Sequence, residues 1–103
     1  MKRRYILAPQ AARDLVAIWR YLKEESSEET ADRVESVIRN KFIYLAEFPN
    51  GGHWRRDLTS ASVRFFSVYS YLIVYRPDTK PLQIVAVLHA RRDIAEILPQ
   101  RGV

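Results

Sequence analysis

One histidine and a group of arginines are the residues of this sequence best suited to carry out chemistry. His89 directly follows an apolar stretch and precedes Arg91 and Arg92, and Arg64 lies in an earlier apolar stretch. An imidazole can act as a general base, and guanidinium groups can neutralise a phosphate in a transition state. If the strands that carry these residues are neighbours, His89, Arg64 and Arg92 can meet, and the set fits cleavage of an RNA backbone.

His89 also has an ordinary structural interpretation, which we favour. A single imidazole at a strand end commonly binds backbone groups or a nearby carboxylate, and Asp93 is four residues away. The other histidine, His53, has no carboxylate at ligand spacing beside it, and the chain contains no cysteine. We therefore expect neither a metal site nor another cofactor.

Further cationic residues are candidates for contact with a partner. Arg76, like Arg64, lies within an apolar strand, where an arginine either extends its head group to water or contacts an acidic surface. Because Arg91 and Arg92 are adjacent, an extended chain would point them in opposite directions and leave at least one free for a partner.

Trp54 is followed by Arg55 and Arg56 in a segment, 53–62, that has no periodicity and is predicted to be a loop. Such a tryptophan could stack on a base or anchor a protein contact. The more common outcome is that it packs over the edge of a sheet. The other tryptophan, Trp19, lies at helical spacing with apolar residues and is predicted to be part of the core.

The elements that must position these residues begin with three consecutive strands, predicted at 63–68, 70–76 and 82–88. They are rich in β-branched and aromatic residues, and the cluster 77–81 (Pro-Asp-Thr-Lys-Pro) breaks the chain between the last two, which indicates an antiparallel meander. Strict alternation in the last strand would place residues 82, 84, 86 and 88 on one face and Val85 and Val87 on the other. The middle strands are apolar on both faces and need cover on both.

An N-terminal helix hairpin is predicted to supply one of these covers. A short strand at 4–7 precedes a helix over 10–25, and a second helix follows to about residue 47, starting at a capping box of Ser26 and Glu29. The hairpin can cover only one face, so we expect the other to be covered by another protein. Residues 93–98 are predicted to be a single helical turn or an extended tail.

Composition limits the class of protein and its partners. The 103 residues fit one domain, 1–103, no stretch approaches membrane-spanning length, and the absence of cysteine suits the cytoplasm. The net charge is +5, and most of the excess lies in residues 51–103, which hold eight Lys/Arg against four Asp/Glu. An acidic partner is therefore expected. No predicted helix exposes the basic face of a DNA recognition helix, so we expect no direct sequence-specific DNA binding.

The order of elements and several motifs together resemble the ParE/RelE superfamily of toxins from type II toxin–antitoxin systems, over nearly the whole chain. The ending His-x-x-Arg-Asp is more similar to the ParE branch. The motifs are Ala11-x-x-Asp14-Leu15-x-x-Ile18-Trp19, Leu45-x-x-Phe48-Pro49-x-Gly51, Arg64-x-Phe66-x-Val68-x-x-Tyr71-Leu72-Ile73-Val74-Tyr75-Arg76 and Val87-Leu88-His89-x-x-Arg92-Asp93.

This resemblance implies an α+β fold in which the helix hairpin packs on one face of an antiparallel sheet of about four strands. It also implies a cytoplasmic toxin, of the kind linked to plasmid stabilization, that poisons DNA gyrase by binding and is neutralised by a cognate antitoxin. An acidic, amphipathic antitoxin segment would suit a basic, apolar sheet. The candidate contacts with target or antitoxin are Arg64, Arg76, Arg91, Arg92, Trp54, Arg55 and Arg56.

Two alternatives remain within the resemblance. A RelE-like ribosome-dependent mRNA endonuclease would use His89, Arg64 and Arg92, although that branch commonly ends in a tyrosine and none follows Tyr75. A non-toxic relative would retain only antitoxin binding.

The sequence departs from the family at one turn. Relatives commonly have a glycine between the first two strands of the meander, whereas this chain has Val68-Tyr69-Ser70. A tyrosine at positive φ would be strained, so we expect a wider turn or a different register.

Overall fold

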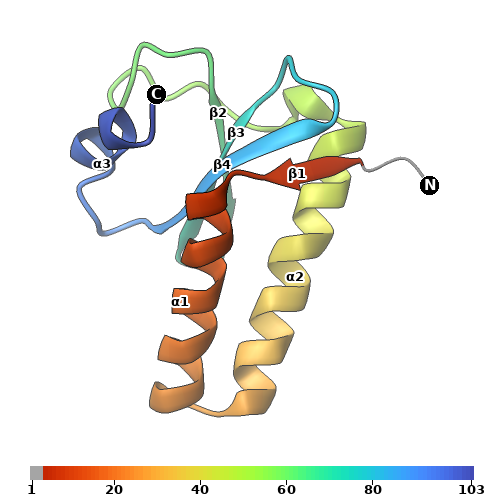
Figure 1. Cartoon of the computed structure of the whole chain (residues 1–103), viewed down its shortest axis with the longest axis vertical. Coiled ribbons are helices and arrows are strands. Elements are labelled where there is room, and N and C mark those ends of the chain that lie inside the picture. Colours follow the sequence, from red (N-terminus) through yellow and green to blue (C-terminus); the bar gives the residue numbers. More distant parts are fainter. Residues whose placement is uncertain (1–3) are drawn as a thin grey trace.

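The computed structural model describes residues 4–103 and confirms the predicted α+β fold. Helices α1 and α2 form an antiparallel hairpin that lies across one face of a four-stranded sheet (Figure 1). The elements are β1 (Tyr5–Leu7), α1 (Pro9–Glu25), α2 (Glu28–Glu47), the short 3-10 helix η1 (Pro49–Gly51), β2 (Arg64–Val68), β3 (Tyr71–Arg76), β4 (Leu82–His89) and α3 (Ile94–Gln100).

The start of α2 differs by one residue from the predicted capping box. Ser27 is the N-cap, and its hydroxyl accepts a hydrogen bond from the Thr30 backbone N–H at 3.0 Å. Ser26 instead ends α1, where its own N–H donates to the Leu22 carbonyl at 2.9 Å. The connection between the helices is so short that one serine must close the first helix while the next opens the second.

The apolar stripes of both helices face the sheet as predicted, with two exceptions. Trp19 is only partly buried, because its indole Nε1–H donates to Asp32 Oδ1 at 2.8 Å and so ties the outer parts of α1 and α2 together. Phe48, at the end of α2, is 52% exposed. The buried members are Ala11, Leu15, Ala31, Val34, Ile38, Phe42 and Leu45.

The sheet has the order β1-β4-β3-β2 and is mixed. The meander β2-β3-β4 is antiparallel as predicted, but β1 pairs with β4 in parallel. Helices α1, α2 and η1 and strands β2 and β3 separate β1 from β4 in the sequence, which provides the long crossover that a parallel pair requires.

The turn between β2 and β3 is tight, so the expectation of a wider turn or altered register is wrong. Val68 pairs directly with Tyr71, which leaves a two-residue connection. Tyr69 adopts a left-handed conformation with φ 54° and exposes its side chain to solvent. This conformation costs a non-glycine residue about 1–2 kcal/mol, and the surrounding ladder holds the turn in place.

The alternation predicted for β4 fails because the strand contains a β-bulge. Val85 is the extra residue in the register opposite β3. Leu82 and Ile84 face the helix hairpin as one set, but Ala86 and Leu88 face the opposite side together with Val85. The bulge therefore gives the second face three apolar side chains from this strand.

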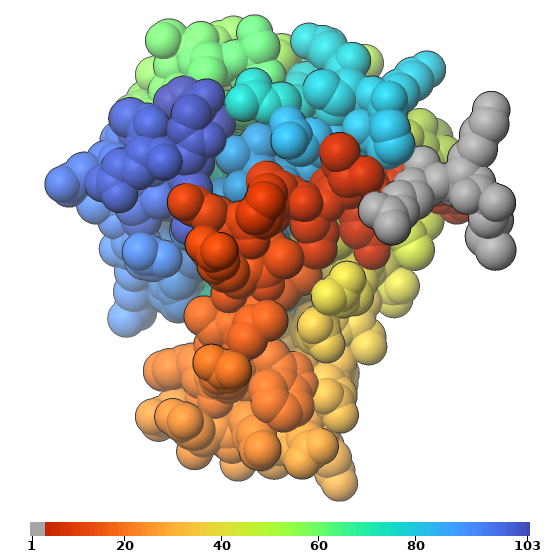
Figure 2. Space-filling model, viewed as in Figure 1, coloured from red at the N-terminus to blue at the C-terminus, as the bar shows by residue number. Residues whose placement is uncertain are grey.

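The second face of the sheet is covered by the chain itself, so the expectation that another protein must cover it is wrong. Ile94 and Leu98 of α3 are buried against this face, and Leu58, Ala61 and Val103 pack around them. Figure 2 shows the C-terminal segment lying beside the start of α1. The cover was missed because α3 is short and contributes only two buried side chains, too few for a clear helical period.

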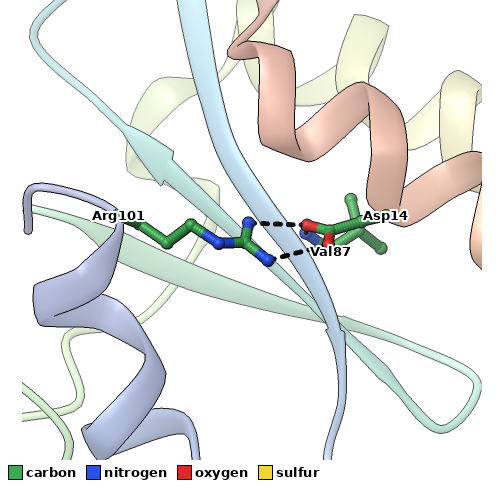
Figure 3. Close-up of polar contacts among 3 residues, drawn as sticks. All are labelled: Asp14, Val87 and Arg101. Atoms are coloured by element: carbon green, nitrogen blue, oxygen red, sulfur yellow. Dashed lines mark hydrogen bonds and ion pairs between the residues drawn. The ribbon is translucent and has the colours of Figure 1, made fainter.

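An ion pair joins α1, β4 and the C-terminus (Figure 3). Asp14 Oδ1 and Oδ2 accept from Arg101 Nη2 and Nη1 at 2.8 and 2.9 Å, and Oδ2 also accepts from the Val87 backbone N–H at 3.0 Å. The two charged side chains are 9% and 11% exposed. The hydrogen bonds that Arg101 donates to Asp14 raise the pKa of the Arg101 guanidinium. Strand β1 ends at Leu7 and pairs with β4 only as far as Ile84. The Val87 N–H therefore has no strand partner on that edge, and Asp14 accepts its hydrogen bond instead.

A second polar anchor lies where η1 passes the sheet. The Gly52 N–H donates to Tyr75 Oη at 2.8 Å, and the Tyr75 hydroxyl donates to the Pro49 carbonyl at 2.7 Å. Burial raises the pKa of Tyr75, so the hydroxyl remains a donor at neutral pH.

We predict that Gly52→Ala destabilises the protein by about 1–3 kcal/mol, the usual cost of overpacking. A Cβ at this position would lie 2.5 Å from Tyr75 Oη and 2.9 Å from the Phe65 carbonyl oxygen. Gly51→Ala is the control, because its Cβ would meet the ring of Tyr44 at 3.1 Å, and that ring lies at the surface and can move. Urea unfolding measures both variants, and equal losses would contradict the proposed close packing at Gly52.

We predict that Arg101→Met destabilises the protein by about 3–5 kcal/mol, because it leaves the Asp14 carboxylate buried without its counter-charge. Methionine resembles the apolar part of the arginine side chain, so the loss of stability measures mainly the removal of the guanidinium charge. Adding Asp14→Ala should recover part of this loss in a double-mutant cycle by urea unfolding. Glu35→Ala, which breaks the half-exposed Glu35–Arg39 pair, should cost no more than about 1 kcal/mol. A comparable loss in both single variants would argue against the buried pair as an anchor.

Candidate interaction surface

Trp54 and two arginines form a stacked cluster beside β2. The guanidinium carbons of Arg64 and Arg56 lie 4.2 and 4.9 Å from the centroid of the Trp54 ring. Arg64 comes from the edge strand, whereas Trp54 and Arg56 come from the loop that follows η1. The interpretation of Trp54 as a tryptophan packed at the sheet edge is consistent with this geometry, and its side chain remains 41% exposed.

The loop is attached to β2 by backbone hydrogen bonds. His53 and Phe65 exchange two of them, each 2.8 Å long, so residue 53 blocks part of the outer edge of β2. Arg64 Nη1 donates to the Gly52 carbonyl at 2.9 Å. Its Nε is buried without a hydrogen-bond partner within residues 4–103, which carries a desolvation cost. The backbone of His53 thus has a structural role, because its two hydrogen bonds with Phe65 attach the loop to the edge of the sheet.

The other arginines of the loop and of β3 are largely engaged within the chain. Arg55 forms a two-pronged ion pair with Asp57, with distances of 2.9 and 2.8 Å. The hydrogen bond from Arg55 lowers the pKa of the Asp57 carboxyl. Arg76 Nε donates to Gln83 Oε1 at 2.9 Å, and its Nη2 approaches the Gly102 carbonyl at 3.5 Å. Arg56 and Arg64 are engaged as well, because Arg56 Nη1 donates to the Ser60 carbonyl at 3.0 Å and Arg64 Nη1 donates to the Gly52 carbonyl at 2.9 Å. What distinguishes these two is that their guanidinium groups lie over the exposed Trp54 ring.

His89 lies at the far end of β4, where its ring packs edge-on against Tyr71 with centroids 5.5 Å apart. Its Nδ1 accepts a hydrogen bond from the Arg91 backbone N–H at 3.1 Å. Of the two partners expected for the imidazole, a backbone group or the Asp93 carboxylate, His89 binds the backbone group, which is the Arg91 N–H. Asp93 instead caps α3, accepting from the Glu96 N–H at 3.3 Å.

The three residues named for RNA cleavage are not brought together. Arg64 pairs across the ladder with Tyr75, whereas His89 pairs with Tyr71 at the other end of the same strand. Four residues of strand separate these positions, or about 13 Å. The Arg64 guanidinium is also held on Trp54, in the loop region that residue 53 fastens to the strand.

Arg91 and Arg92 project from a short turn between β4 and α3, which we call the 90–93 turn. Both are exposed, and within residues 4–103 their side chains form no hydrogen bond or ion pair. Backbone bonds hold the turn at both ends, from Ala90 N–H to the Ser70 carbonyl at 2.8 Å and from Arg92 N–H to the His89 carbonyl at 3.0 Å. The two arginines are thus presented to solvent from an ordered backbone.

The sequence analysis missed several residues that shape these surfaces. Asp14 and Arg101 lie 87 positions apart, and no local pattern joins them. Tyr44 was overlooked because it lies outside the apolar stripe of α2, yet it remains at the surface beside Phe48 and Phe66. Its position on the polar side of the helix was the signal that could have identified it.

Two classes of site find no support in the described part of the chain. Residues 4–103 contain no group of three or more side chains arranged to hold a metal ion. Among the same residues, no helix combines the length and the hydropathy needed to cross a membrane.

Comparison with known proteins places this arrangement in a family. A solved structure described as the chromosomal ParDE TA system from P. aeruginosa matches with a TM-score of 0.70 and 22% identity, covering 82% of this chain and 92% of that one. At that identity the likeness concerns the fold. No curated protein sequence matches significantly. The family model described as "ParE toxin of type II toxin-antitoxin system, parDE" matches residues 5–94. The chain therefore belongs to the ParE toxin family of type II toxin–antitoxin systems.

Proposed function

We propose that this protein is a cytoplasmic toxin that inhibits DNA gyrase by binding and is neutralised by a cognate antitoxin. The observation that carries the proposal is the ParE family match over residues 5–94, which includes the sheet, the helix hairpin and the 90–93 turn. The structural neighbour from P. aeruginosa belongs to a ParDE TA system, which supports an antitoxin as partner.

Binding accounts for the geometry better than catalysis does. A general base and the cation that stabilises a phosphate must both reach the same reacting group. His89 and Arg64 are separated by about 13 Å of strand, and the Nδ1 of His89 is already engaged by the Arg91 N–H. The His89 ring thus helps to shape the turn that presents the arginines.

The 90–93 turn is the best-formed candidate for contact with the target. Arg91 and Arg92 are exposed cations on a backbone that hydrogen bonds hold, so little conformational entropy of the backbone is lost when a partner binds. Guanidinium groups suit acidic protein surfaces, because they form paired hydrogen bonds with carboxylates. We assign gyrase contact to these two arginines.

The second candidate function is cleavage of mRNA on the ribosome. One observation favours it: His89 packs on Tyr71 beside the 90–93 turn, so an imidazole, a phenol and two arginines lie near one another. Burial raises the pKa of Tyr71, which keeps its hydroxyl protonated and able to donate a proton.

Expression of the chain without any antitoxin tests both functions. We predict that the wild type induces the DNA-damage response while protein synthesis continues, and that purified protein inhibits supercoiling by gyrase. His89→Ala should keep this activity, whereas Arg91→Glu with Arg92→Glu should need at least about tenfold more protein, equivalent to about 1.4 kcal/mol of binding. The matched control, Arg20→Glu with Arg33→Glu, changes the net charge equally at two exposed helix arginines and should leave inhibition unchanged.

Two results would reject this account. Arrest of translation that His89→Ala abolishes in a folded protein would establish the nuclease. Normal growth with abundant, folded wild type would identify a non-toxic relative that retains only antitoxin binding.

A further inference from the structure

Three aromatic residues, two of them exposed and one partly buried, lie together where the end of α2 meets the edge strand β2. The ring of Tyr44 is 5.3 Å from that of Phe48 and 5.8 Å from that of Phe66. Tyr44 is 41% exposed and Phe48 is 52% exposed, whereas Phe66 is partly buried against the core. Neighbouring exposed rings of this size are uncommon on a surface that contacts only water.

Cations accompany these rings. Lys41 Nζ lies 5.9 Å from the ring centroids of both Tyr44 and Phe66. Arg64 lies two residues from Phe66 on the same face of β2, about 7 Å along the strand, and leads to the stacked cluster at Trp54. The whole surface, which we call the aromatic–cation strip, comprises Tyr44, Phe48, Phe66 and Trp54 with Lys41, Arg56 and Arg64.

We propose that the aromatic–cation strip is the docking surface for an acidic segment of the antitoxin, whose apolar side chains cover the rings while its carboxylates bind the three cations. This inference rests on the proposed function for the existence of that partner and adds the place and chemistry of the contact. Charge complementarity supports it, because the rings require an apolar occupant while the cations require a negative one.

The same features argue against two other occupants. A second copy of the chain that docked symmetrically through its own strip would place cations against cations, since the strip carries three of them. A nucleic acid would need a free aromatic face for base stacking, but the Trp54 ring already has guanidinium carbons at 4.2 and 4.9 Å. An acidic peptide meets neither obstacle.

The strip lies apart from the 90–93 turn. Arg64 pairs with Tyr75 at one end of β3, whereas His89, which shapes the turn, pairs with Tyr71 at the other. Substitutions in the strip should therefore weaken antitoxin binding without removing target contact. This separation makes the inference testable independently of toxicity.

The probe is a synthetic amphipathic peptide of about 20 residues with glutamate on one side and leucine and phenylalanine on the other. Its control replaces every glutamate with lysine. We expect the acidic peptide to shift backbone amide signals of the isotope-labelled full chain mainly along residues 41–48, 53–56 and 64–67. The lysine peptide should produce no shifts there.

Variants locate the binding. Lys41→Glu with Arg56→Glu, and separately Tyr44→Ser with Phe48→Ser, should each weaken the acidic peptide at least about tenfold. Arg20→Glu with Arg33→Glu changes charge equally away from the strip and should not, and circular dichroism should show all three variants folded. Shifts centred elsewhere, equal binding of both peptides, or equal weakening by the control would overturn the proposal. Strip-dependent dimerisation, or tighter binding of single-stranded RNA than of peptide at the strip, would also overturn it.

The two proposals fail in different ways. A non-toxic chain that binds the acidic peptide along the strip would retain the docking surface and reject the gyrase function. A toxic chain that binds the peptide away from the strip would reject the docking surface alone.

Discussion

The central strands β3 and β4 are apolar on both faces, and most of the architecture follows from covering them. One face receives the α1–α2 hairpin, and the other receives α3 with the loop before β2. Burial of these side chains provides the main favourable free energy of folding, at about 25 cal/mol per Å² of apolar surface. A sheet that is apolar on both faces is unstable with either face exposed to water, so two separate parts of the chain pack on it, one on each face.

The two covers differ in how they are held. The helix hairpin is long, with a continuous apolar stripe in each helix, whereas α3 has seven residues and buries only two side chains. The Asp14–Arg101 pair compensates for this weakness, because it joins the segment after α3 to α1 and to the β4 backbone at once. The Asp14 carboxylate accepts three hydrogen bonds, two from Arg101 and one from the Val87 N–H. Without it, the Val87 N–H would be buried without a partner.

The two proposed contacts, with the antitoxin and with the target, lie on different parts of the sheet. The aromatic–cation strip extends from Arg64, opposite Tyr75 at one end of β3, to Phe66, opposite Ile73 in its middle, and the 90–93 turn lies beyond the other end. A rigid sheet between them fixes their separation. An antitoxin that docks at the strip would therefore reach the target site only through another part of its chain, which is how a flexible partner can use separate contacts for affinity and for inhibition.

The sequence by itself determined the helix hairpin, the meander and the family resemblance, because helical and strand periods are local properties of neighbouring residues. It also named arginines and Trp54 as candidate contacts, and these assignments stay predictions. Only the tertiary structure decided that β1 lies parallel to β4, that the bulge at Val85 reverses the faces of that strand, and that α3 covers the second face. It also placed His89 and Arg64 at opposite ends of one strand and joined Asp14 to Arg101. Each of these depends on register or on contacts between distant residues, which no local pattern of side chains encodes.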